Sequence, residues 1–139
     1  MSKIFDQPFK KIKPLTFYEI LRLRIDVFVV EQNCPYPELD GFDVDSGTRH
    51  IWLADEESPV SYLRVLRKSK GVDKIGRVAT SLHNRNKGMA KSLIEHVINT
   101  TSGELVLDAQ AYLENWYEEM GFITNGKAFE EGCGDDTNS

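Results

Sequence analysis

Along the first thirty residues, the order of apolar and polar positions predicts a strand followed by a helix. Residues 9–13 alternate enough to form a first strand. Thr16 and Glu19 have the spacing of a capping box, in which each side chain bonds to the other residue's backbone amide, so a helix is expected over 16–30. At helical spacing, its buried side should carry Phe17, Ile20, Leu21, Val27 and Phe28.

The middle of the chain has the pattern of a long loop followed by three strands. Residues 31–49 are rich in Pro, Gly, Asp and Asn without periodicity, and a loop of that length in a compact domain is often functional. Residues 50–54 and 60–66 are typical of strands, and the turn-forming stretch between them favours an antiparallel hairpin. After a polar turn, a third strand is expected over 75–80.

The last third of the chain alternates helices with strands. Apolar residues recur at helical spacing from Met89 to about Asn99, and residues 105–109 predict a strand. A third helix and a last strand, 122–124, should follow. The third helix has one apolar face and a C-terminal cap, formed by Leu113, Trp116, Tyr117, Met120 and Gly121. Hairpins precede alternating units, an order that predicts an α/β protein with a mixed sheet.

Composition is ordinary for a single globular domain spanning 1–139. Of 139 residues, 40% are hydrophobic and 28% charged, and the acidic tail from about residue 130 is expected to be loose. No apolar run approaches the roughly 20 residues that span a membrane, and the N-terminus lacks a signal peptide's apolar stretch. Cys34 and Cys133 form no metal-ligand or redox motif. We expect a cytoplasmic protein with free thiols, no metal site and no membrane partner.

The net charge of -5 is unevenly distributed. Residues 64–91 hold nine basic residues and one acidic residue, whereas 26–59 hold nine acidic residues and one arginine. Such asymmetry suits a protein that binds an anion on one side and attracts a cation on the other, although two solvated faces would give the same pattern. The basic segment lacks interleaved aromatic residues, which argues against a nucleic-acid partner.

The turn between the strand at 75–80 and the following helix has the features of an anion site. The first amides of a helix have no intrahelical partner, and together with the helix dipole they attract negative charge. Gly88 lets a phosphate approach the backbone closely, and Arg85, Lys87 and Lys91 add cationic donors. The alternative is that Gly88 only caps the helix and that the lysines are ordinary surface residues, with no anion bound. The P-loop and GxGxxG signatures are both absent.

Three separated motifs resemble one family. Residues 85–90, Arg-Asn-Lys-Gly-Met-Ala, match the R/Q-x-x-G-x-G/A signature of the GNAT acetyltransferases. Residues 110–122 resemble the family's segment that ends in aromatic-Tyr-x-x-x-Gly-Phe. Residues 21–36, with Asp-Gly-Phe-Asp at 40–43 and Thr-Arg-His at 48–50, are similar to the ElaA-like subfamily.

The resemblance implies a GNAT-type fold, a mixed, mostly antiparallel twisted sheet flanked by helices. It also implies acetyl-CoA as cofactor and direct acetyl transfer to an amine of a small molecule or peptide. The strand before the turn would bind the pantetheine arm, and the turn itself the pyrophosphate. The cofactor residues so implied are Val78, Ala79, Thr80, Arg85, Asn86, Lys87, Gly88, Met89, Ala90, Lys91 and Asn115.

Proton transfer would fall to residues on either side of the reacting groups. Tyr117 matches the tyrosine that protonates the leaving thiolate in many GNAT enzymes, although it also lies on its helix's apolar face. Glu31, Asp40 and His50 are candidate bases for the acceptor amine, with Glu31 preferred at the edge of the acidic loop, and a bridging water is the alternative. The acidic loop is expected to flank the acceptor entrance and to favour cationic amines. Cys34 has no assigned partner that would make it a nucleophile.

The C-terminus departs from the family pattern. Residues 129–139 lack the apolar alternation of a last sheet strand, so that strand is expected to be missing or diverged. An open sheet edge invites pairing, and a homodimer is therefore one expectation. Two other functions fit the same resemblance: a CoA-binding or interaction module without turnover, and an enzyme like the acyl-homoserine-lactone synthases, against which the short chain argues.

Overall fold

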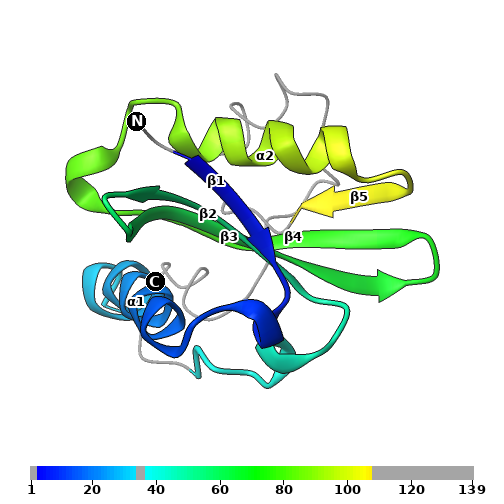
Figure 1. Ribbon diagram of the computed structural model, residues 1–139, viewed down its shortest axis with the longest axis horizontal. Coiled ribbons are helices and arrows are strands. Elements are labelled where there is room, and N and C mark those ends of the chain that lie inside the picture. The colour runs from blue at the N-terminus through cyan, green and yellow to red at the C-terminus, as the bar shows by residue number, and fades with distance from the viewer. Residues whose placement is uncertain (1–2, 34–36, 108–139) are drawn as a thin grey trace.

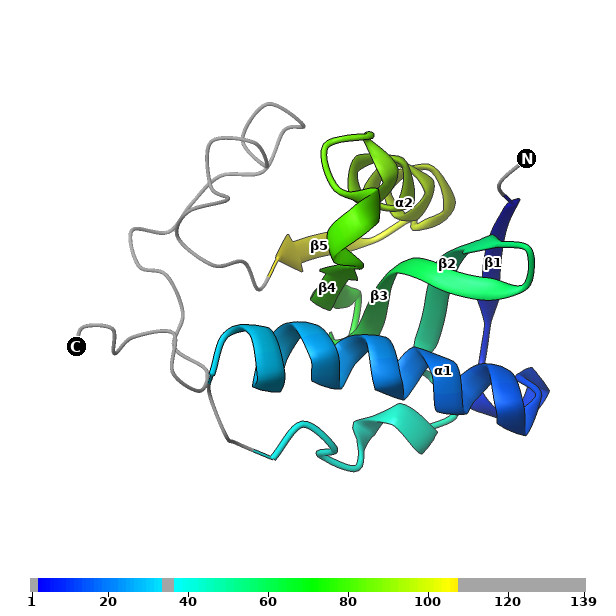
Figure 2. The ribbon, with the colours of Figure 1, turned by 90° about the vertical axis from the view of Figure 1, so that its left-hand side faces the viewer.

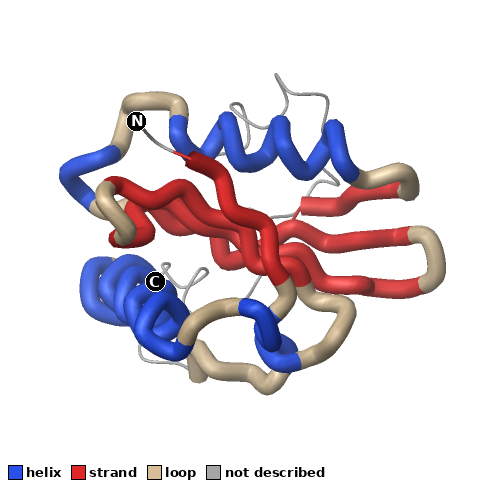
Figure 3. Tube along the Cα trace, in the orientation of Figure 1, coloured by secondary structure: helices blue, strands red, loops and turns tan. Residues whose placement is uncertain are grey.

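The computed structural model describes residues 3–33 and 37–107, which form a sheet between two helices (Figures 1 and 3). The strands are β1 (Lys3–Gln7), β2 (Arg49–Asp55), β3 (Ser58–Ser69), β4 (Val72–Thr80) and β5 (Glu104–Leu107). The helices are α1 (Pro14–Ile25) and α2 (Met89–Thr100). The strands lie in sequence order, antiparallel from β1 to β4, and β5 runs parallel to β4. The expected mixed, mostly antiparallel sheet is therefore confirmed.

Side-chain alternation along the strands builds a separate core on each face of the sheet. Ile51 and Leu53 of β2 pack with Leu93 and other residues of α2, whereas Trp52 and Ala54 belong to the cluster that includes α1. Successive residues of a strand point to opposite faces, so this alternation lets one strand bury both faces. Figure 2 shows α1 and α2 on opposite sides of the sheet.

The predicted first strand is wrong. The strand that begins the sheet is β1, which pairs with β2 in the register Lys3↔Ala54 to Gln7↔His50, while Phe9–Lys11 forms a 3₁₀ turn. Pro8, which has no backbone N–H to donate, follows directly after β1.

Helix α1 begins two residues before the predicted cap. Pro14 is its first residue, Lys13 is the N-cap, and no side chain caps the helix. Proline suits a first helical position because its missing N–H has no intrahelical partner there. A π-helical segment, Asp26–Glu31, continues α1, in agreement with the predicted end near residue 30. Of the predicted buried side, Ile20, Val27 and Phe28 are buried and Phe17 and Leu21 are half-buried.

The β2–β3 hairpin, the third strand of that run and helix α2 are confirmed. The strand predicted over 105–109 corresponds to β5, which begins one residue earlier, at Glu104. The predicted third helix, the last strand at 122–124 and the tail from about residue 130 lie outside the described residues. Within 3–33 and 37–107, no helix has the length and apolar character that a membrane crossing requires.

A polar cluster joins edge strand β1 to β2 and α2. Asp6 accepts hydrogen bonds from Arg49 at 2.6 Å and 3.2 Å, and His96 Nε2 lies 2.9 Å from Asp6 Oδ2. Burial acts to raise the pKa of Asp6, but the hydrogen bonds from Arg49 and His96 outweigh it and lower the pKa below its ordinary value. The ionised carboxylate is therefore the form that the folded protein stabilises.

Asp6→Asn should lower the free energy of unfolding by about 1–2 kcal/mol at pH 7 because it weakens charge-assisted hydrogen bonds. The stabilisation from a carboxylate with a lowered pKa is present above the unfolded value of about 3.9 and is lost as pH falls through the folded value. Urea denaturation should show a smaller difference in the free energy of unfolding between parent and variant at pH 3 than at pH 7. Asp55→Asn, at an exposed position of β2, is the control, and an equal effect there would contradict the prediction.

Candidate functional site

The turn between β4 and α2 ends at a helix N-terminus that the chain enters through left-handed residues. Arg85 is extended, with φ −79° and ψ 161°, Asn86 has φ 64°, and Gly88, with φ 76°, is the N-cap of α2. The first amides of a helix have no intrahelical partner and, together with the helix dipole, attract anions, so we call residues 85–91 the anion turn. A Cβ added to Gly88 would meet nothing within 4 Å, so glycine is required here for its backbone conformation. Lys87 and Lys91 are exposed beside this turn, and Met89 and Ala90 are half-buried.

The end of β4 leads into that turn through Ser81 and a 3₁₀ turn, Leu82–Asn84. Among the described residues, β5 pairs with β4 only as far as Ile75↔Leu107, so residues 76–80 pair with β3 alone. Thr80 Oγ1 lies 2.8 Å from Ser61 Oγ, which ties the strand end to β3. Within the described residues, the predicted pantetheine strand therefore pairs on one side only where it approaches the anion turn. In this stretch Val78 and Thr80 are half-buried and Ala79 is buried.

A β-bulge lies just before this strand end. The register of β3 and β4 shifts between the pairs Tyr62↔Ala79 and Arg64↔Gly76, which leaves one extra residue on β4. Arg77 in this interval has φ 53°, the left-handed region that non-glycine residues rarely adopt. A bulge bends and twists the strand that carries it, and bulges are frequent beside active sites.

Arg85 bridges three segments. Its Nε donates to the Thr80 carbonyl at 2.9 Å, and its two terminal nitrogens each bind a Glu31 carboxylate oxygen at 2.6 Å. Hydrogen bonds from Arg85 lower the pKa of Glu31 below its ordinary value, although burial acts in the other direction. Glu31 is therefore a weaker base than its residue type alone indicates, and it lies at the anion turn.

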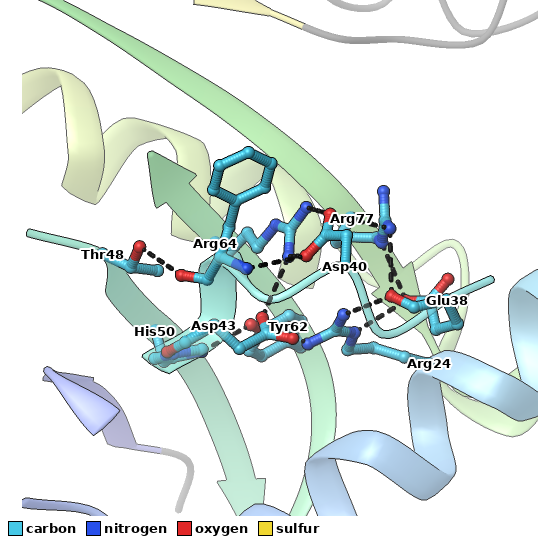
Figure 4. Close-up of polar contacts among 10 residues, drawn as sticks. Arg24, Glu38, Asp40, Asp43, Thr48, His50, Tyr62, Arg64 and Arg77 are labelled. Atoms are coloured by element: carbon cyan, nitrogen blue, oxygen red, sulfur yellow. Dashed lines mark hydrogen bonds and ion pairs between the residues drawn. The ribbon is translucent and has the colours of Figure 1, made fainter. Parts of the chain in front are cut away.

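Ion pairs among six charged side chains connect the predicted acidic loop to the sheet and to α1 (Figure 4). We call Arg24, Glu38, Asp40, Asp43, Arg64 and Arg77 the ionic network. Arg24 is fully buried and binds Glu38 and Asp43, each at 2.8 Å. Arg64 binds Asp43 at 3.0 Å and Asp40 at 2.5 Å. Three arginines thus balance three carboxylates, of which Glu38 and Asp43 are buried and Asp40 is partly exposed.

The ionic network corrects the prediction of a free acidic surface over this loop. Glu38, Asp40 and Asp43 form ion pairs with arginines, so their charge is neutralised within the protein. Burial acts to raise the pKa of Asp40, but Arg64 outweighs it and lowers the pKa to about 2. Besides Asp40 and Asp45, the loop exposes the apolar side chains of Leu39, Phe42 and Val44. Because arginines neutralise these three carboxylates, we do not expect them to attract a cationic acceptor.

His50 belongs to the core that supports this loop. It is fully buried, and its Nδ1 lies 2.7 Å from the Tyr62 hydroxyl while its Nε2 lies 2.9 Å from the Asp43 carbonyl oxygen. Burial lowers the pKa of His50, which favours the neutral ring. Because both ring nitrogens are engaged and the side chain is shielded from solvent, this geometry does not favour His50 as the base. Asp40, the other candidate, is paired with Arg64.

The predicted residues fall into separate groups in the structure. The turn 85–91, the strand end 78–80 and Glu31 lie together, whereas His50 lies in the core. Tyr117 and Asn115 lie outside the described residues. Within the part of the chain that is described, no group of His, Cys, Asp or Glu could hold a metal ion.

Sequence reasoning missed the arginines of the ionic network. A signal was present for Arg24, because it stands four residues after Ile20 and four before Phe28, in the middle of an apolar helix face. A charge at such a position is rarely buried unless a partner neutralises it. No comparable local signal marks Arg64 or Arg77.

Comparison with known proteins agrees with this geometry. The sequence model of the Acetyltransferase (GNAT) domain matches residues 26–133. Protein ElaA of Escherichia coli K12 is 38% identical over 123 residues, which cover 82% of this chain and 79% of that protein. The crystal structure of Escherichia coli ElaA has a TM-score of 0.87 at 33% identity and covers 94% of this chain and 93% of its own.

A second similar solved structure is that of a protein named for an activity. The acyl-CoA N-acyltransferase from Pseudomonas aeruginosa has a TM-score of 0.85 at 30% identity, with 93% of both chains covered. The domain match spans most of the chain, and the ElaA sequence is similar over more than two thirds of both proteins. This chain therefore belongs to the GNAT acetyltransferase family and is ElaA-like within it.

Proposed function

We propose that this protein is an N-acyltransferase that moves the acetyl group of acetyl-CoA to an amine. The observation that carries the proposal is the N-terminus of α2 at the anion turn, which follows, after a short 3₁₀ turn, a strand end paired on one side among the described residues. A ligand with a pyrophosphate and a linear amide-containing arm would bind across both features.

The described residues fit such a ligand. Amides of residues 86–90 and the side chains of Lys87 and Lys91 would hold the pyrophosphate, because the helix dipole and both lysines favour negative charge. Backbone groups of residues 78–80 would hydrogen-bond the arm as an added strand would. Arg85 already binds Glu31 and the Thr80 carbonyl, so it stabilises the turn from the side.

The proposed reaction is direct transfer. Bound acetyl-CoA would supply a thioester as the acetyl donor. The amine nitrogen attacks the thioester carbonyl, a C–N bond forms, the C–S bond breaks, the nitrogen loses a proton and the thiolate gains one. Tyr117 is proposed to deliver the proton to sulfur. Glu31 lies at the edge of this site, paired with Arg85, and its carboxylate is proposed to accept a hydrogen bond from the neutral acceptor amine.

Gly88→Val should abolish most acetyl-CoA binding, because a branched side chain disfavours the left-handed backbone and fills the space of the phosphate. For the parent, acetyl-CoA at about 100 times its Kd should stabilise the fold by about 2.7 kcal/mol, measured as a rise in Tm. Calorimetry on parent and variant gives the affinities directly.

Gly71→Val is the matched control. Gly71 also has a positive φ, 75°, and free space around its Cβ position, but it lies in the β3–β4 turn. It should lose similar stability and keep acetyl-CoA affinity. If Gly88→Val binds acetyl-CoA as the parent does, the assigned cofactor site is wrong. A parent that binds acetyl-CoA but acetylates no polyamine, amino acid or peptide would favour the binding module instead.

A further inference from the structure

The bulge in β4 is held by a buried side chain from a distant loop. Arg77 has the left-handed backbone conformation that L side chains disfavour, so other contacts must stabilise it. Its Nε donates to Glu38 Oε2 at 2.8 Å and its Nη2 to the Glu38 carbonyl at 3.0 Å (Figure 4). Only 9% of the Arg77 side chain and 3% of the Glu38 side chain are exposed.

Glu38 in turn is fixed from the other side of the loop. The same carboxylate oxygen, Oε2, accepts a hydrogen bond from Arg24 Nε at 2.8 Å, and Arg24 Nη2 reaches the Glu38 carbonyl at 3.3 Å. Arg24 belongs to α1 and is fully buried. Glu38 thereby connects the first helix to the bulged residue of β4, and both of its arginines bind its backbone as well as its carboxylate.

The bulge determines where the end of β4 points. Residues 78–80 follow Arg77 immediately and, in the described part of the chain, pair only with β3. One extra residue on β4 shifts their register against β3 by one position, and a one-residue shift exchanges the two faces of a strand. These are the residues to which we assign the arm of acetyl-CoA.

We propose that Glu38 and Arg77 are positioning residues for the acetyl donor, which they align by fixing the β4 bulge. This inference rests on the proposed function. On this proposal, the acidic loop does not attract the acceptor. Its role is to hold β4 in place through the ion pair between Glu38 and Arg77. The nucleotide end of the cofactor, bound at the turn 85–91, should be independent of the pair.

Arg77→Ala and Glu38→Gln test the proposal. Arg77→Ala should lower kcat/KM for acetyl-CoA by about tenfold or more through a raised acetyl-CoA KM, since displacing residues 78–80 removes hydrogen bonds that the arm makes in the ground state and the transition state alike. The acceptor KM and the Kd for 3′-phosphoadenosine 5′-diphosphate, which carries the pyrophosphate without the arm, should stay within about twofold of the parent. Glu38→Gln keeps the shape and should give a smaller effect of the same kind.

Arg77→Gly separates the backbone from the side chain. Glycine adopts the left-handed conformation readily, so the acetyl-CoA KM of this variant should be much closer to the parent value than that of Arg77→Ala. Arg67→Ala is the control, because Arg67 also pairs β3 with β4, through Asp73 at 3.0 Å, but is 65% exposed. It should behave as the parent.

Two results would overturn the positioning role. One is an unchanged acetyl-CoA KM in Arg77→Ala, and the other is an equal loss of affinity for the nucleotide fragment, which indicates general damage to the fold. A parent protein that binds neither acetyl-CoA nor the fragment would instead reject the proposed function itself.

Discussion

Replacing Arg24 by Met should lower the free energy of unfolding by about 3–5 kcal/mol, the range measured when one partner of a buried ion pair is removed. Methionine fills a similar volume, so the loss is electrostatic more than steric. Arg24 is fully buried and hydrogen-bonds Glu38 and Asp43, which are themselves buried. Its removal leaves two carboxylates in the interior with one cation fewer.

Arg22→Met is the matched control for this variant. Arg22 lies on the same helix, its side chain is 66% exposed, and its nearest carboxylate oxygen, on Glu19, is 3.6 Å away. Surface changes of this type usually alter stability by less than about 0.5 kcal/mol. Urea denaturation measures the change in the free energy of unfolding for each variant, provided that the m-values of parent and variants are equal. An Arg24→Met variant no less stable than Arg22→Met would show that the ionic network contributes little.

The effect of Arg24→Met should depend on pH. Burial acts to raise the pKa of Asp43, but the hydrogen bond and charge of Arg24 outweigh it, and the pKa is lowered. A lowered carboxyl pKa stabilises the fold above the unfolded value, about 3.9, and this stabilisation is lost as pH falls through the folded value. The difference between parent and Arg24→Met should therefore be largest near neutral pH and should narrow below about pH 4.

The strands and helices that could be predicted from the sequence are those in which apolar and polar residues recur with the period of a strand or a helix. In β2 and β3 each face packs against its own core cluster, and turn residues mark both ends of the hairpin. Strand β1 was missed because Ile4 and Phe5 are both apolar: Ile4 packs in the α2 cluster and Phe5 in the α1 cluster. A strand that packs apolar side chains on both faces shows no alternation of apolar and polar residues, so a period of two cannot identify it.

The anion turn was predictable because its features are local. Gly88, its neighbouring basic residues and the following helix start all lie within a few residues of each other. The ionic network was not predictable in this way. Glu38 lies 14 residues from Arg24 and 39 from Arg77, and only the folded backbone brings them together. Acidic residues in an aperiodic loop therefore gave the pattern of a solvated surface, although Glu38 and Asp43 point inward.

Tyr117→Phe should lower kcat by about 10²–10⁴-fold, the usual contribution of a general acid or base, while acetyl-CoA affinity stays close to that of the parent. The argument is chemical: the thiolate that leaves the thioester needs a proton, and a phenol can donate one and stabilise the developing charge. A general acid must be protonated, so kcat should decline as pH rises through the phenol's pKa, about 10 when unperturbed. This decline should disappear in Tyr117→Phe.

Tyr62→Phe is the control for loss of a phenol hydroxyl. The Tyr62 hydroxyl lies 2.7 Å from His50 Nδ1, and burial raises the pKa of this phenol, so it serves the core as a neutral hydrogen-bonding group. Its removal should cost about 1–2 kcal/mol of stability and leave kcat near the parent value. The two tyrosines thus separate proton delivery from packing: steady-state rates report the first, and urea denaturation reports the second. If Tyr117→Phe loses stability but keeps its rate, as expected for Tyr62→Phe, then Tyr117 is a packing residue and the thiolate receives its proton from another group.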